Sequence, residues 1–151
     1  MAEQTEDDAS IPALLRDARG SYSRAITRGL AREGIEDLPR NGPFVLGAMA
    51  RWGGSAADVI GYLGVTKQAA SQLIDTLVLR GYLTREVNAE DRRRMTIELT
   101  DRGRAAAKAV RAAIAEVDKQ LGTMITPAQL AGLRAGLMAL GRINQRPREN
   151  S

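Results

Sequence analysis

The chain has 151 residues, enough for one compact domain, and its 44% hydrophobic and 26% charged residues are ordinary values for a globular protein. It contains no histidine and no cysteine, which excludes disulfides, cysteine nucleophiles, histidine acid–base relays and zinc sites with thiolate or imidazole ligands. The isoelectric point near 10.0 favours a polyanionic partner.

The N-terminal region combines an acidic tail with a long helix. Residues 1–9 are acidic and lack apolar periodicity, which predicts a disordered tail. From Ser10, a predicted cap, apolar residues recur at steps of three and four up to Leu30. This pattern predicts an amphipathic helix over about residues 10–33, ending near Gly34.

The centre of the chain predicts three helices. The first begins around Pro39 to Pro43 and ends at Gly53 and Gly54. Ser55 is expected to cap a short helix that ends at Gly64, and Thr66 to cap the next, which ends at Gly81. Two helices joined by a short turn that contains glycine are typical of a helix-turn-helix.

After Gly81 the apolar period changes from 3.6 to 2. Residues 83–87 and 95–100 alternate apolar and polar side chains, which predicts two strands of a hairpin. The charged loop from Asn88 to Arg93 should project into solvent.

The C-terminal region predicts two more helices and a tail. Thr100 is expected to cap the first, and Thr126 with Gln129 forms the capping box of the second. Residues 144–151 are expected to be a flexible basic tail. No apolar stretch approaches the ~20 residues of a membrane span and no signal peptide is visible, so a cytoplasmic location is expected.

The fourth helix and the hairpin loop carry the residues expected to contact DNA. On the helix, the apolar side holds Ala70, Leu73, Ile74 and Leu77. The opposite side holds Gln68, Ser71, Gln72 and Asp75, with Lys67 at the margin. Glutamine, serine and lysine can reach base edges and phosphates. An arginine on a thin hairpin loop can enter the minor groove, oriented by an aspartate two residues earlier. The expected contacts are Ser55, Thr66, Lys67, Gln68, Ser71, Gln72, Arg85, Asp91, Arg92 and Arg93.

The stretch from Leu63 to Arg104 resembles the DNA-binding lobe of MarR-family transcriptional regulators, through the motifs GVTKQAASQLID, RGYLTR, DRR and LTDRGR. The resemblance implies a mainly α (α+β) fold, a winged helix-turn-helix lobe over about residues 38–100 with dimerisation helices over about 10–33 and 101–143, in one domain spanning 10–143. It also implies a homodimer on a palindromic operator, with a recognition helix in the major groove, and Asp91 and Arg93 as the Asp-x-Arg pair of the wing.

The family resemblance further implies a crevice for a small aromatic or anionic ligand that weakens DNA binding. Its candidate wall residues are Arg16, Arg19, Tyr22, Met49 and Trp52, of which Met49 and Trp52 also fit core positions. No cofactor and no metal site are expected.

Three classes of function fit different parts of this pattern. A sequence-specific repressor or activator, with a repressor favoured, is the first interpretation. The alternative is a winged-helix protein that binds DNA architecturally or binds another protein. An enzyme is not expected, because its best case, the adjacent carboxylates of Glu90 and Asp91, lies beside three arginines that would pair with them.

Overall fold

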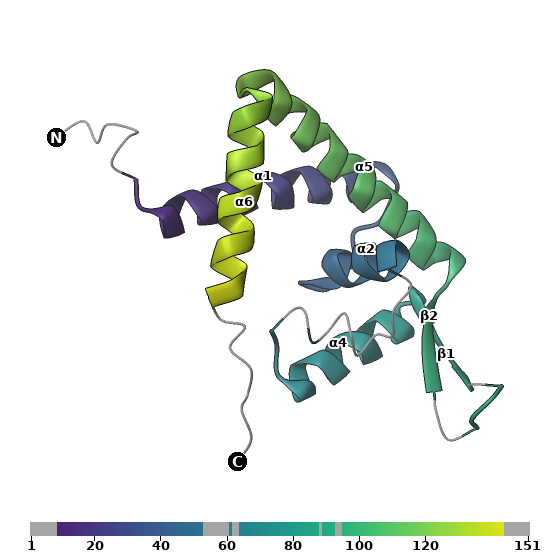
Figure 1. Cartoon of the computed structure of the whole chain (residues 1–151). Coiled ribbons are helices and arrows are strands. Elements are labelled where there is room, and N and C mark those ends of the chain that lie inside the picture. Colours follow the sequence, from purple (N-terminus) through teal and green to yellow (C-terminus); the bar gives the residue numbers. More distant parts are fainter. Residues whose placement is uncertain (1–8, 53–60, 62–63, 88, 93–94, 144–151) are drawn as a thin grey trace, which may run out of the picture. The chain divides into compact units, whose positions relative to one another are not determined.

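The computed structural model describes residues 9–52, 61, 64–87, 89–92 and 95–143. Within them, five helices and one two-stranded antiparallel sheet follow in the order α1 (Ile11–Arg32), α2 (Gly42–Trp52), α4 (Lys67–Leu79), β1 (Leu83–Val87), β2 (Met95–Leu99), α5 (Asp101–Met124) and α6 (Pro127–Ile143) (Figure 1). The predicted mainly helical winged-helix fold is confirmed. The short helix expected to begin at Ser55 lies outside the described residues.

The chain divides into two compact units, Met1–Ala115 and Glu116–Ser151. The first unit holds α1, α2, α4, the hairpin and the first part of α5. The second holds the end of α5 and the whole of α6. No helix in the described part of the chain is long and apolar enough to cross a membrane.

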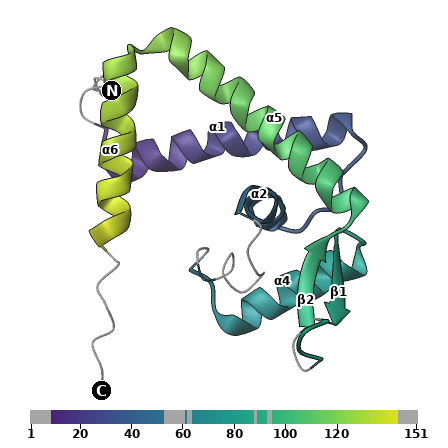
Figure 2. The same cartoon turned by 45° about the vertical axis from the view of Figure 1, so that its right-hand side comes forward.

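One hydrophobic core organises the first unit. In Figure 2, α2 is viewed nearly end-on and lies between α4 on one side and α1 with α5 on the other. Val45 and Leu46 of α2, Leu77 of α4 and Val110 of α5 are almost completely buried. Burying such side chains stabilises a fold by roughly 1.5–3 kcal/mol each, so this core fixes which face α4 leaves exposed.

Small residues let α1 and α5 approach closely. A Cβ added at Gly29 of α1 would lie only 3.2 Å from the Cβ of Ala113 on α5. Buried Ile26 and Leu30 flank this crossing, so α1 is anchored to α5 through its C-terminal half.

The ends of the helices follow the predicted capping residues, with one exception. Thr66 accepts a 3.2 Å hydrogen bond from the backbone N–H of Ala69, and Thr126 and Gln129 exchange the two bonds of a capping box. Ser10 occupies the N-cap position of α1, but its side chain makes no capping hydrogen bond. Pro12 has no N–H to donate, which removes one of the two backbone groups that a cap side chain can bond. The predicted N-cap position is therefore confirmed, without its side-chain hydrogen bond.

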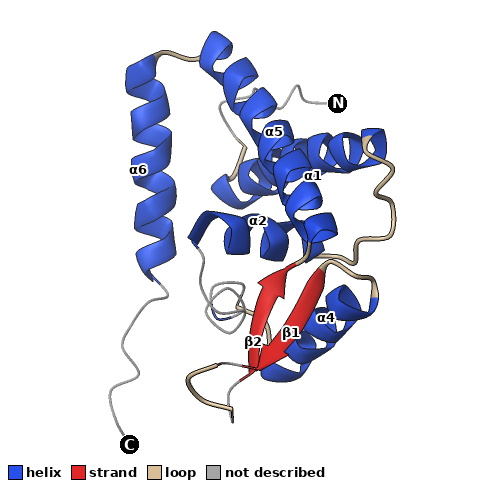
Figure 3. Ribbon diagram, turned by 90° about the vertical axis from the view of Figure 1, so that its right-hand side faces the viewer, coloured by secondary structure: helices blue, strands red, loops and turns tan. Residues whose placement is uncertain are grey.

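The hairpin has the predicted strands and an uninterrupted register. Leu83 pairs with Leu99, and Val87 pairs with Met95. Figure 3 shows the two strands side by side. The helix before it ends in a Schellman motif, in which Gly81 has a φ of +78°, and the N–H groups of Gly81 and Tyr82 donate to the carbonyls of Val78 and Leu77. This turn directs the chain from α4 straight into β1.

The start of α5 lies against the backbone of that same turn. A Cβ added at Gly103 would overlap the carbonyl oxygen of Tyr82, which itself accepts a 3.1 Å hydrogen bond from the N–H of Thr100. The Thr100 hydroxyl donates to the carbonyl of Gly81 at 2.5 Å and accepts from the N–H of Gly103 at 3.1 Å. Only glycine fits at position 103 without displacing this turn.

Gly103→Ala should therefore lower the free energy of unfolding by about 1–3 kcal/mol, the usual cost of overpacking a tight contact. Gly122→Ala on the same helix is the control, since a Cβ there meets nothing within 4 Å. Replacing a helical glycine in open space should stabilise by up to about 1 kcal/mol. Urea unfolding of both variants measures the difference, and equal stability of the two would contradict the close packing.

Candidate nucleic-acid interface

The exposed face of α4 presents the polar residues that the sequence singles out. Ala70, Ile74 and Leu77 are buried and fix the helix on the core. Lys67, Gln68, Ser71 and Gln72 are exposed, as is Thr66 at the N-cap. The first turn of α4 is capped and lies at the protein surface. Its hydrogen-bond donors and acceptors are therefore available to a macromolecule.

An ion pair joins α4 to the wing, which is the hairpin of β1 and β2 with its loop. The sequence pattern did not predict this pair. Arg85 of β1 donates through Nη2 to the carboxylate of Asp75 on α4. Both side chains remain partly exposed, at 42% for Arg85 and 58% for Asp75. The pair brings a predicted contact residue of the wing to the exposed face of α4.

The wing loop is described only in part. Asp91 and Arg92 are exposed, while Arg93 and Ser55 lie outside the described residues. In Figures 1 and 3, residues 89–92 are drawn at the end of the hairpin away from α5. The loop tip is therefore separate from the core of the first unit.

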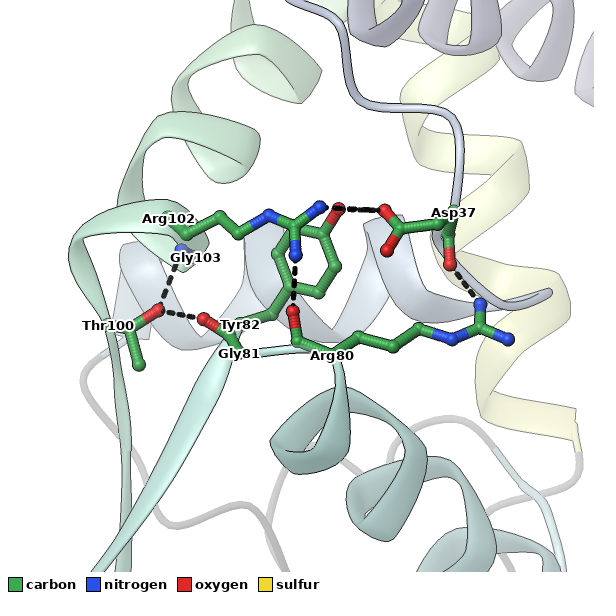
Figure 4. A network of polar contacts seen from close by, with 7 residues as sticks. All are labelled: Asp37, Arg80, Gly81, Tyr82, Thr100, Arg102 and Gly103. Carbon is green, nitrogen blue, oxygen red and sulfur yellow. Dashed lines mark hydrogen bonds and ion pairs between the residues drawn. The ribbon is translucent and has the colours of Figure 1, made fainter.

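A polar network at the α5 end of the hairpin ties three segments together (Figure 4). The carboxylate of Asp37, from the segment between α1 and α2, accepts hydrogen bonds from the Tyr82 hydroxyl and, at 3.1 Å, from the Arg102 guanidinium. Arg80 donates to the backbone carbonyl of Asp37, and Arg102 donates to that of Arg80. The sequence motifs RGY and TDRGR thus meet here, a contact that the sequence pattern alone did not predict.

The network shifts the pKa values of its two acidic groups. Burial, reinforced by the hydrogen bond to Asp37, raises the pKa of Tyr82 to about 12. The hydrogen bond from Tyr82, helped by the charge of Arg102, holds the pKa of Asp37 below its usual value. The guanidinium of Arg102 also lies 4.3 Å from the centroid of the Tyr82 ring, a cation–π contact.

A cavity of about 710 Å³ lies beside α1. Arg16 and Arg19 line it from α1, while Arg40, Asn41 and Phe44 line it from the following segment and the start of α2. The guanidinium carbon of Arg19 is 5.9 Å from the centroid of the Phe44 ring. The cavity therefore combines three arginines, Arg16, Arg19 and Arg40, and one carboxylate, Glu36, with an aromatic wall.

The other three residues expected at a ligand crevice are placed differently. Tyr22 is half-buried and Met49 is a core residue with 6% exposure, and neither lines this cavity. The side chain of Trp52 lies outside the part of the chain that is described. Among the described residues, no group of three acidic side chains could hold a metal ion.

Comparison with known proteins agrees with this arrangement. The model of the MarR family matches residues 37–94, which run from Asp37 through α4 and β1 into the wing. That segment of the chain is similar to the MarR family. No curated protein sequence matches the chain.

Solved structures extend the MarR-type fold over most of the chain. S. aureus MepR in a DNA-binding conformation superposes with a TM-score of 0.73 at 21% identity, covering 91% of this chain and 100% of MepR. The S. aureus MepR–DNA complex gives 0.68 at 21% identity, covering 88% and 97%. MepR bound to ethidium bromide gives 0.55 at 21% identity, covering 93% and 100%.

The raised pKa of Tyr82 predicts that the protein loses stability at alkaline pH. The unfolded tyrosine ionises near pH 10, whereas the folded one stays protonated up to about pH 12. The Tyr82 contribution is thus complete below pH 10 and is lost as the pH rises from about 10 to about 12. Asp37 has the opposite pH dependence, because its pKa is lowered in the folded protein. Its contribution to stability is present at neutral pH and is lost in acid.

Urea unfolding of the wild type and of Tyr82→Phe checks the tyrosine. The difference between their free energies of unfolding should stay constant from about pH 6 to 9 and shrink between about pH 10 and 12. A difference that stays constant through pH 11 would show that Tyr82 titrates alike in the folded and unfolded protein.

Proposed function

We propose that this protein is a sequence-specific DNA-binding transcriptional regulator, acting as a repressor. The observation that carries the proposal is the exposed polar face of α4 beside an arginine-bearing wing, in a chain of net charge +4. Glutamine and serine side chains can bond base edges in the major groove, and lysine and arginine bind phosphates. A similar structure, that of S. aureus MepR, has been solved as a complex with DNA, which supports the same use of the fold.

Each contact residue has a proposed role. Gln68, Ser71 and Gln72 read base edges, and Thr66 and Lys67 hold the phosphate beside the start of α4. Arg92 and Arg93 of the wing, with Asp91 orienting the loop, contact the minor groove. Ser55 is proposed to contact the DNA backbone, on sequence grounds alone.

The regulator should act as a homodimer on a palindromic operator. In the described part of α6 no residue is buried, and Leu133, Leu137, Met138, Leu140 and Ile143 leave apolar surface exposed. Near the start of α1, Ile11 and Leu14 are more than half exposed as well. Surface of this kind is normally covered by a partner, and a second copy supplies matching surface through two-fold symmetry.

Sedimentation of the full chain at micromolar concentration should show a dimer. Leu137→Glu should shift it to a monomer, because a carboxylate would be buried in the apolar interface. Ala135→Glu, which adds the same charge on the opposite side of the α6 helix, should leave the dimer intact. A compact wild-type monomer would refute the homodimer.

We further propose that an organic anion binds the cavity beside α1 and releases the DNA. Its volume lies within the range of roughly 300–1,000 Å³ typical of ligand sites, and Arg16, Arg19 and Phe44 suit an aromatic carboxylate. Benzoate is a suitable probe: it should weaken the protein–duplex complex, and Arg19→Gln should bind DNA normally but lose the response. A full response in Arg19→Gln would place the ligand elsewhere.

Two variants of α4 should fail in different ways. Lys67→Ala should weaken binding to all duplexes and reduce the salt slope by about one per subunit, because it loses a phosphate contact. Gln68→Ala should cost about 1–3 kcal/mol on the preferred duplex only, because it loses a base contact. Lys108→Ala, an exposed lysine of α5, is the charge control.

Fluorescence anisotropy at several salt concentrations measures these affinities, with a duplex selected from a random pool and a scrambled one. The wild type should prefer the selected palindrome by about 1,000-fold or more. Weak preference would favour the architectural alternative, and no DNA binding would favour a protein-binding role. Unchanged affinities in both α4 variants would show that another element reads the DNA.

A further inference from the structure

Asp75 is a carboxylate in the middle of the α4 face that we assign to DNA. Steps of 100° per residue place it between Gln68 and Ser71, on the side of the helix opposite buried Ala70 and Leu77. A carboxylate at that position faces the negative potential of the duplex, which weakens binding of any sequence. Its presence therefore needs a compensating role.

The compensating role involves Arg85, the ion-pair partner of Asp75. Arg85 reaches Asp75 from β1, and on the same face of that strand Leu83 is buried and anchors the strand to the core. The ion pair uses one Nη group of a guanidinium that carries five N–H donors in a rigid plane. The remaining donors stay on a side chain that is 42% exposed at the edge of the α4 face.

We propose that Asp75 is a positioning residue that orients the guanidinium of Arg85 toward a base edge and thereby sets sequence specificity. This inference rests on the proposed function, since it requires that α4 and β1 meet DNA. An arginine reads guanine through two parallel hydrogen bonds, which demand a fixed plane. A freely rotating arginine can instead pair with any phosphate, whatever the sequence.

Replacing Asp75 should change the affinities for the scrambled and the selected duplex in opposite directions. Asp75→Asn removes a negative charge from the interface and frees Arg85, so affinity for a scrambled duplex should rise about threefold to tenfold. The same change removes the orientation of Arg85, so affinity for the selected duplex should fall about tenfold. Exposed ion pairs add little to folding stability, so the melting temperature should stay close to that of the wild type.

The experiment measures the ratio of affinities for the selected and scrambled duplexes in the full chain. Asp75→Asn should lower this ratio by about 30-fold or more, and Asp75→Glu, which keeps the charge, should recover part of it. Asp17→Asn is the matched control, because it makes the same charge change at an exposed ion pair of α1. It should leave the ratio unchanged.

The charge-swapped variant Asp75→Arg/Arg85→Asp distinguishes two roles of the ion pair. One role is to orient Arg85, and the other is only to join α4 to β1. A salt bridge that only joins α4 to β1 would be restored by the swap, and the affinity ratio with it. A positioned Arg85 would not be restored, so the ratio should stay low while the melting temperature is unchanged. Recovery of the ratio in the swapped variant would overturn the inference.

The outcomes for the inference and for the proposed function are distinct. If the wild type discriminates about 1,000-fold and Asp75→Asn discriminates equally well, the positioning role is wrong and the proposed function stands. If the wild type does not discriminate, the proposed function fails and Asp75 has no specificity to set.

Discussion

The close approach of α5 to the carbonyl of Tyr82 is the constraint on which the rest of the first unit depends. Gly103 has to lack a side chain there, and Thr100 has to bond both sides of the contact. Once this contact is formed, β2 leads directly into α5 and the turn after α4 leads directly into β1. This junction, formed by the turn after α4 and the start of α5, positions the exposed face of α4, the hairpin and the start of α5. Asp37 binds the segment before α2 to the same junction.

Charge is arranged differently at the two sides of this junction. At the α5 end of the hairpin, Arg80 and Arg102 bond carbonyls and Asp37, so these arginines stabilise the fold. At α4, Lys67 is exposed and Arg85 is held by the carboxylate of Asp75. A count of basic residues would treat all four alike. Only their contacts separate cations that hold the lobe together from those that can meet a polyanion.

The features predicted correctly from the sequence are those set by local rules. The caps at Thr66 and Thr126, the glycine that ends α4 and the alternation in the hairpin each depend on residues a few positions apart. Ser10 stands at the predicted N-cap position of α1, but its side chain makes no capping hydrogen bond. The Asp37 network and the Asp75–Arg85 pair were missed because their partners are brought together only by the tertiary fold. Periodicity likewise gave no sign that Arg40 and Phe44 form a wall of the cavity.

The separation in sequence of the junction contacts has a consequence for the order of folding. Thr100 and Gly81 are 19 residues apart, and Arg102 and Arg80 are 22 apart, whereas Asp37 lies 43 residues from Arg80 and 65 from Arg102. Closing a short loop costs less chain entropy than closing a long one. The hairpin with its two flanking turns is thus the segment best suited to nucleate the lobe, and it presents two arginines already clustered for Asp37. Docking of the N-terminal segment then completes the lobe as a late step, so the rate of unfolding should respond more to changes at Asp37 than to changes at Thr100.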